Sequence, residues 1–150
     1  MTKDKGFDKY CEIARNNSER FDFVAAGRFQ NDTEGLELRN KAEISNVEIL
    51  GFVDFKEFLK LVDAIVLPIQ WNEPFGRVIV ESALAGVEVY SNKVGGISEL
   101  YDIFDELPVS ASLQSPDELP DVLSSDALCG KHQKAGSSFR SEVGFPSIVR

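Results

Sequence analysis

The chain has 150 residues, of which 43% are hydrophobic and 27% are charged, a balance typical of one globular domain with its own apolar core. Its net charge of −9 argues against a nucleic acid as the main partner, because contacts with a phosphate backbone require a basic face. No apolar run reaches the roughly 18 residues of a membrane-spanning helix, and the N-terminus carries no apolar signal region, so we expect a cytoplasmic protein without a membrane span.

Two hydrophobic patterns alternate along the first two thirds of the chain. Apolar residues at i, i+3, i+4 and i+7 mark amphipathic helices, and short apolar runs that end at glycine or proline mark buried strands. In chain order, we expect a helix at 7–14, a strand at 21–27, a helix at 33–44, a strand at 46–51, a helix at 55–62, a strand at 64–68, a helix at 75–85, a strand at 87–91 and a short helix at 98–103. This alternation predicts an α/β fold with a parallel sheet and right-handed crossovers.

The pattern weakens beyond about residue 107. Ser115 and Pro116 are suited to begin a helix, as cap and first-turn residue. The segment 130–150 is polar and contains three glycines, which indicates a weakly stable helix or a loose tail. Neither an internal repeat nor a linker divides the sequence, so we predict a single, partial domain over residues 1–150.

The cysteines do not form a recognisable site. Cys11 and Cys129 are far apart in the sequence and belong to no CxxC motif, which favours free thiols over a disulfide or a metal site. Cys11 lies on the apolar stripe of the first helix, so we expect it in the core. The single His132 cannot build a metal cluster or a catalytic triad by itself.

The segment 68–81 carries the most chemical information. In parallel α/β sheets, ligands bind at the carboxyl ends of the strands, and this segment follows the third strand. Pro74 is suited to the first turn of the next helix, and Gly76 leaves that helix end without an obstructing side chain. Backbone N–H groups and the positive end of the helix dipole at such a position make a site for a phosphate.

Two carboxylates, Glu73 and Glu81, flank this helix N-terminus and are eight residues apart. If most of the intervening chain is helical, their backbones are about 10 Å apart. That spacing is wide for the carboxylate pair of a retaining glycosidase, which needs about 5–5.5 Å. It suits a ligand with hydroxyl groups at both ends and phosphate in the middle, and a nucleotide sugar has this form.

These residues resemble family 4 of the retaining GT-B glycosyltransferases, also called glycosyl transferases group 1. The hallmark of that family is an E-x7-E pattern, found here at residues 73–81. Further matches are the strand and turn at 46–53, the segment 83–86, the turn at 94–100 and the Lys-Gly pair at residues 5 and 6. The order and spacing of these segments agree with the family pattern over residues 5–100. The resemblance implies the C-terminal, donor-binding half of a GT-B enzyme, with a Rossmann-like parallel sheet covered by helices on both faces.

The resemblance also implies roles by position. Glu73 would bind sugar hydroxyls near the reacting carbon as the catalytic carboxylate, Glu81 would hold the ribose, and Lys5 would neutralise the pyrophosphate. The remaining donor contacts would be the backbones of Val53 (at the base), Phe75 and Gly76 (at the sugar and phosphate), and Gly95 and Gly96 (at the ligand). No metal and no other cofactor is expected, since in this family basic side chains and helix dipoles stabilise the charge of the phosphate groups in place of a metal ion.

The sequence departs from the family pattern in several respects, one of which is Glu88 at a position where the family commonly has proline. In the family, a strand that ends in a Gly-Arg pair precedes the Lys-Gly helix, and we find no equivalent of that strand or its arginine in residues 1–150. Arg28 and Arg77 are each better interpreted as surface arginines than as its replacement. An acceptor-binding domain is also lacking from these residues, and half a cleft cannot hold donor and acceptor together.

Three functional hypotheses therefore remain open. The chain is the donor half of a hexosyltransferase of polysaccharide biosynthesis that works with an acceptor domain located elsewhere, or a non-catalytic nucleotide-binding module, or an inactive remnant. In each case, we expect no sugar transfer by these residues alone.

Overall fold

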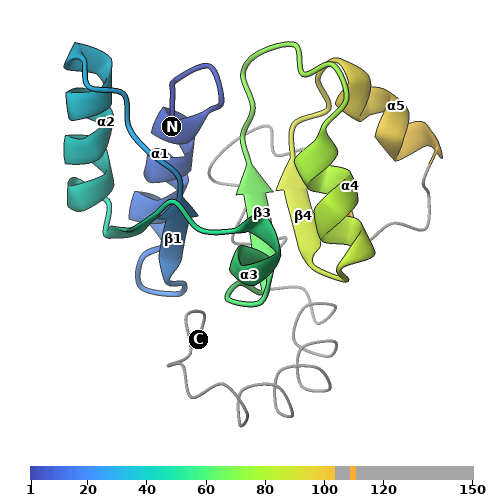
Figure 1. Cartoon of the computed structure of the whole chain (residues 1–150), viewed down its shortest axis with the longest axis horizontal. Helices are drawn as coiled ribbons and strands as arrows, with labels where there is room; N and C mark the ends of the chain where they lie inside the picture. The colour runs from blue at the N-terminus through green and yellow to red at the C-terminus, as the bar shows by residue number, and fades with distance from the viewer. Residues whose placement is uncertain (104–108, 111–150) are drawn as a thin grey trace, which may run out of the picture.

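A computed structural model of the chain describes residues 1–103 and 109–110 (Figure 1). Helices and parallel strands alternate, as predicted. The elements are α1 (Phe7–Asn17), β1 (Phe23–Ala26), α2 (Thr33–Ile44), β2 (Val47–Gly51), α3 (Phe55–Leu59), β3 (Ala64–Leu67), α4 (Arg77–Leu84), β4 (Glu88–Ser91), α5 (Gly96–Ile103) and β5 (Val109–Ser110). The helix expected to begin at Ser115 and the segment 130–150 lie outside the described residues.

Side chains just before two helices explain where these helices begin. The carboxylate of Asp32 accepts a hydrogen bond of 2.7 Å from the Gly35 N–H in the first turn of α2. The carboxylate of Asp54 accepts one of 3.0 Å from the Lys56 N–H in the first turn of α3. Such caps satisfy donors that have no partner within the helix. The structure thus confirms the sequence-based choice of these two helix starts.

Two other helices begin at residues that differ from the prediction. α4 begins at Arg77, two residues later than expected, because Gly76 at its N-cap has a left-handed backbone with φ of 72°. α5 begins at Gly96, two residues earlier than expected. The short strand β5 was not predicted at all.

The parallel strands are arranged in two sheets rather than one. β1 pairs with β2 in one sheet, and the other sheet has the order β3-β4-β5. All three pairings are parallel. Among the residues that the structure describes, no backbone hydrogen bond joins β1 to β3. In Figure 1 these two strands are nevertheless neighbours, at the left and centre of the view.

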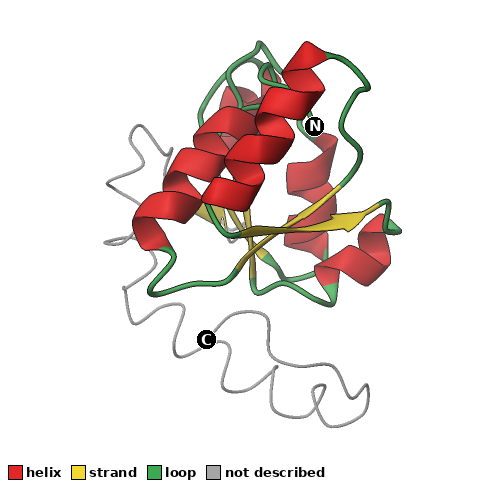
Figure 2. Cartoon of the chain, turned by 90° about the vertical axis from the view of Figure 1, so that its left-hand side faces the viewer, coloured by secondary structure: helices red, strands yellow, loops and turns green. Residues whose placement is uncertain are grey.

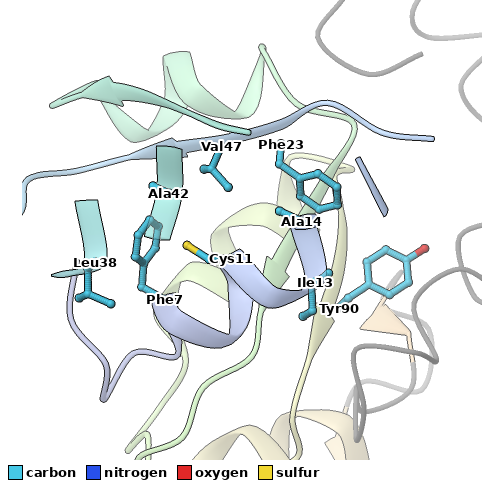
Figure 3. Packing of buried hydrophobic residues seen from close by; sticks show 9 residues of the cluster. All are labelled: Phe7, Cys11, Ile13, Ala14, Phe23, Leu38, Ala42, Val47 and Tyr90. Atoms are coloured by element: carbon cyan, nitrogen blue, oxygen red, sulfur yellow. The ribbon is translucent and has the colours of Figure 1, made fainter. Parts of the chain in front are cut away.

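The first core cluster lies under α1 and reaches both sheets. Figure 3 shows its nine buried residues, Phe7, Cys11, Ile13, Ala14, Phe23, Leu38, Ala42, Val47 and Tyr90. Cys11 is 1% exposed, as expected for a core residue, and burial raises the pKa of its thiol to about 11. α1 and α2 pack side by side over the β1–β2 sheet (Figures 1 and 2).

The second core cluster joins α4 and α5 to the β3–β4 sheet. Its members are Leu59, Ile65, Ile69, Ile79, Val87, Val89, Ile97 and Leu100. The burial of α4 and α5 against this sheet fixes the position of the chain segments that precede each helix. Within the described residues, no helix is long and apolar enough to span a membrane.

Candidate functional site

The candidate site lies around the loop that joins β3 to α4, residues 68–76, which forms a high arch in Figure 1. This loop follows the carboxyl end of β3, where ligands bind in parallel α/β sheets. The two ends of this loop differ in how far their side chains are exposed. Pro68 and Ile69 at the start are buried, whereas Phe75 near the end is 58% exposed.

Glu73 is held in place by hydrogen bonds at both its side chain and its backbone. Its half-buried carboxylate accepts a hydrogen bond of 3.2 Å from the Gly76 N–H, which closes the turn into α4. Its backbone carbonyl accepts one of 2.8 Å from the Gly96 N–H at the start of α5. The side chain of Glu73 is therefore positioned before any ligand arrives.

A comparison of two substitutions of Glu73 distinguishes the effect of its hydrogen bond from the effect of its charge. We expect Glu73→Ala to lower the free energy of unfolding by about 1 kcal/mol, because the Gly76 N–H loses its acceptor. In Glu73→Gln the amide oxygen still accepts this bond, so less than half of that loss is expected. Urea denaturation followed by circular dichroism measures both values. Equal losses in the two variants would show that the bond to Gly76 does not stabilise the turn.

Gly95 and Gly96 pack directly against the loop. A Cβ atom on Gly95 would lie 2.4 Å from the Glu73 carbonyl oxygen, and one on Gly96 would lie 2.0 Å from the Pro74 carbonyl oxygen. Neither distance is available to a real side chain, so only glycine permits the two backbones to approach this closely. The pair predicted from the sequence as a place of close backbone approach has that property, although its partner is the protein's own loop.

The start of the loop rests on the N-terminus of α1. Gly6, the N-cap of α1, has φ of 75°, and a Cβ atom at this position would lie 1.8 Å from the Pro68 carbonyl oxygen. The Gln70 N–H donates to the Asp4 carbonyl at 3.3 Å, and the Gln70 amide donates to the Asp8 carboxylate at 3.2 Å. Lys5 is exposed next to these contacts.

Glu81 lies in the second turn of α4 and forms an ion pair. Its carboxylate is 3.2 Å from the Nε of Arg77, one helical turn earlier. The two side chains are 43% and 82% exposed, so water weakens this pair. Arg77 is a surface arginine, as the sequence predicted, but its partnership with Glu81 was not foreseen.

Val53 does not contact the other predicted site residues in any described interaction. It is half-buried in the turn after β2, which belongs to the other sheet. Next to it, the ring of Phe52 is 78% exposed, and the Arg28 guanidinium carbon lies 5.6 Å from the ring centroid. Both residues directly follow a glycine at the carboxyl end of a strand, Gly27 after β1 and Gly51 at the end of β2, but their contact with each other was not predicted from the sequence.

Asn92 also contacts the loop, although no role was assigned to it from the sequence. It follows β4, and its amide donates a hydrogen bond of 2.8 Å to the Ile69 carbonyl within the loop. It lies at the carboxyl end of a strand, beside Gly95 and Gly96, where ligands bind in parallel α/β sheets.

These contacts bring three helix N-termini to one loop. α4 begins at the end of the loop, α1 meets it at Pro68, and α5 meets it at Pro74. The positive ends of three helix dipoles favour an anion here, and Lys5 adds a positive charge at the α1 end. Among the described residues, no group of three His, Cys, Asp or Glu side chains could hold a metal ion.

Comparisons with known proteins agree with this architecture. A family model described as "Glycosyl transferases group 1" matches residues 2–121. An uncharacterised 42.6 kDa protein in the cps region of Klebsiella pneumoniae is 44% identical over 120 residues, which are 80% of this chain and 31% of that protein. The chain therefore spans about a third of the length of this relative.

Two crystal structures of Alr3699/HepE from Anabaena are similar in fold. The complex with UDP-glucose superposes with a TM-score of 0.71 at 22% identity, over 87% of this chain and 38% of that one. The complex with UDP and glucose superposes with a TM-score of 0.66 at 18% identity, over 94% of this chain and 46% of that one. At these identities, the likeness is one of fold, that of part of a GT-B glycosyltransferase.

Proposed function

Because this chain belongs to the glycosyl transferases group 1 family, we propose that it binds the nucleotide-sugar donor of a retaining glycosyltransferase. The observation that carries the proposal is the meeting of three helix N-termini at the loop 68–76, of which the N-terminus of α4 lies between Glu73 and Glu81 in the sequence. The pyrophosphate of a nucleotide sugar is an anion, and the partial positive charge at these helix N-termini favours its binding. The flanking carboxylates match the hydroxyl groups on either side of it in a nucleotide sugar.

The residue roles follow from their positions around the loop. Glu73, which the Gly76 N–H holds at the start of α4, faces the sugar as the catalytic carboxylate. Glu81 binds the ribose, and Lys5 neutralises the leaving pyrophosphate. The backbones of Phe75 and Gly76 contact the sugar and phosphate, and Val53 contacts the base. Gly95 and Gly96 contribute by holding the loop in position.

Uridine diphosphate is the first nucleotide to test. The Anabaena protein with the same fold was crystallised with UDP-glucose, and this supports a UDP-sugar as donor here. Transfer also needs a bound acceptor, and only proximity of the two substrates makes the reaction fast. We propose that the acceptor site belongs to another domain or chain, consistent with the third of the Klebsiella relative that this chain spans.

The binding of UDP, GDP and ADP by calorimetry tests this function. We expect one of them, UDP in the first instance, to bind, and Glu81→Ala to weaken that binding at least tenfold. The loss follows from two ribose hydroxyls that no longer have a charged acceptor, because hydrogen bonds to charged groups contribute about 1.5–3 kcal/mol.

Two control variants make this result interpretable. Arg77→Ala removes the ion pair and keeps the Glu81 carboxylate, so it is expected to bind UDP as tightly as the unaltered chain or more tightly. Glu43→Ala changes an exposed carboxylate on α2 and is expected to change nothing. If Glu81→Ala binds UDP normally, the ribose role of Glu81 is wrong. If no nucleotide binds the unaltered chain, this chain alone is not a donor-binding module.

A further inference from the structure

The loop between β3 and α4 begins where backbone pairing with β4 cannot continue. The last residues paired in these two parallel strands are Leu67 and Ser91, so the next position would pair Pro68 with Asn92. Proline has no N–H group and cannot extend the ladder of hydrogen bonds. The side chain of Asn92 extends it instead, because its amide donates a hydrogen bond of 2.8 Å to the Ile69 carbonyl.

The peptide group between Ile69 and Gln70 is held on both sides. Its carbonyl accepts the hydrogen bond from Asn92, and its N–H donates to the Asp4 carbonyl at 3.3 Å, just before α1. Because a peptide group is planar, these two bonds fix the direction in which the chain leaves β3. The bond from Asn92 is the shorter of the two and is partly buried.

This hydrogen bond complements the close contacts that glycines make with the loop. Gly6, Gly95 and Gly96 lie so near the loop backbone that no side chain fits between them. Such contacts prevent the loop from moving inward, but short-range repulsion does not prevent it from moving outward. A hydrogen bond is attractive and directional, so the Asn92 amide restrains the outward movement. Together, the two kinds of contact hold the loop from both sides.

The oxygen of the Asn92 amide has no such partner. This Oδ1 atom is buried, and no hydrogen bond reaches it within the part of the chain that the structure describes. A buried acceptor without a donor is destabilising, and native structures contain few of them. Asparagine at this position therefore reduces the stability of the fold in one respect, which proteins accept chiefly at functional sites.

We propose that Asn92 is a positioning residue for the nucleotide-sugar donor, which fixes the start of the loop so that Glu73 is in place before the donor arrives. Its Nδ2 atom is bonded to the loop and its Oδ1 atom is buried, so Asn92 acts through Glu73 rather than by touching the donor. The identity of the ligand rests on the proposed function, whereas the effect of Asn92 on the loop does not depend on it.

The single tryptophan of the chain reports on the loop without any ligand. Trp71 directly follows the fixed peptide group and is 41% exposed. We expect Asn92→Ala to raise the constant for acrylamide quenching of its fluorescence about 1.5-fold or more, because the loop opens to solvent more often. An unchanged quenching constant in a folded variant overturns the proposal.

Calorimetry with UDP-glucose tests the consequence for the donor. We expect Asn92→Ala to bind UDP-glucose about 2- to 10-fold more weakly, the range that corresponds to one neutral hydrogen bond. The midpoint of urea denaturation is expected to stay close to that of the unaltered chain, because the variant loses the unpaired Oδ1 atom together with the hydrogen bond. A large fall in this midpoint at unchanged affinity would make Asn92 a purely structural residue.

Asn92→Asp is a second variant for the case that the smaller alanine prevents folding. It keeps the shape of asparagine but has an oxygen in place of the donor, so we expect it also to raise the quenching of Trp71 and to weaken UDP-glucose binding. Asn40→Ala and Asn40→Asp, at an exposed position of α2, are matched controls that are expected to change neither. If both Asn92 variants fail to fold, the amide is required for the fold itself and the proposal is wrong.

The two measurements separate this inference from the proposed function. If the unaltered chain does not bind UDP-glucose, the donor-binding function fails, and with it the part of the inference that concerns the donor. The quenching of Trp71 then still decides whether Asn92 holds the loop. If the unaltered chain and both Asn92 variants bind UDP-glucose equally well, the donor site stands and the positioning role of Asn92 is wrong.

Discussion

Replacing Gly6 with alanine is expected to destabilise the domain by about 3 kcal/mol or more, a large share of the roughly 5–15 kcal/mol by which folded domains are usually stable. The added Cβ would lie 1.8 Å from the Pro68 carbonyl oxygen and 2.6 Å from the Pro68 carbonyl carbon. These are backbone atoms at the end of a buried strand, so the clash forces α1 away from β3. The left-handed φ of 75° adds a further cost of about 1 kcal/mol for alanine. Urea denaturation with two spectroscopic probes measures the loss.

Gly86→Ala is the matched control for this substitution. Gly86 has the same φ of 75°, but a Cβ atom at this position would have no neighbour within 4 Å. We expect a loss of only about 1 kcal/mol, the cost of the backbone conformation alone. The difference between the two variants isolates the contact with Pro68. Equal losses would mean that α1 does not rest on the end of β3.

Gly96→Ala is expected to reduce UDP affinity at least tenfold and to destabilise the domain by about 1–3 kcal/mol. The added Cβ would lie 2.0 Å from the Pro74 carbonyl oxygen and 3.2 Å from the Phe75 backbone nitrogen. α5 must then move away from the loop, which breaks the hydrogen bond from Gly96 to the Glu73 carbonyl. Glu73 loses its position although its own side chain is unchanged.

Calorimetry at a temperature where the variant is folded separates binding from stability. Gly86→Ala serves again as the control, because Gly86 lies at the far end of α4 from the loop and is expected to leave UDP binding intact. Circular dichroism confirms the folded state of each protein before titration. Normal UDP binding by a folded Gly96→Ala variant would contradict the role of α5 in holding the loop.

The order of helices and strands could be predicted because its signals are local. The spacing of apolar residues identifies α1 and β3, and the aspartates before α2 and α3 mark where those helices begin. The start of α4 was misplaced because the left-handed backbone of Gly76 ends the loop, and periodicity carries no information about φ. β5 was missed because two residues are too short a run to show any period.

The candidate site was predicted only in part, because a motif identifies residues but not their contacts. Glu73, Gly76 and the Gly95–Gly96 pair do lie together around one loop. The packing of Gly6 on Pro68 joins residues that are more than sixty positions apart in the sequence, and no local pattern indicates it. The ion pair of Glu81 with Arg77 depends on side-chain rotamers, which a motif does not specify. The division of the strands into two sheets is a property of the whole fold.

The contacts of the loop 68–76 with Gly6 at one end and Gly95–Gly96 at the other have a thermodynamic consequence for any ligand. Both contacts are made by backbone atoms, which cannot change rotamer, so the loop has little conformational freedom left to lose. The entropy of ordering it is lost when the domain folds rather than when a ligand binds. More of the interaction energy with a ligand is therefore available as affinity, which is the advantage of a preorganised site.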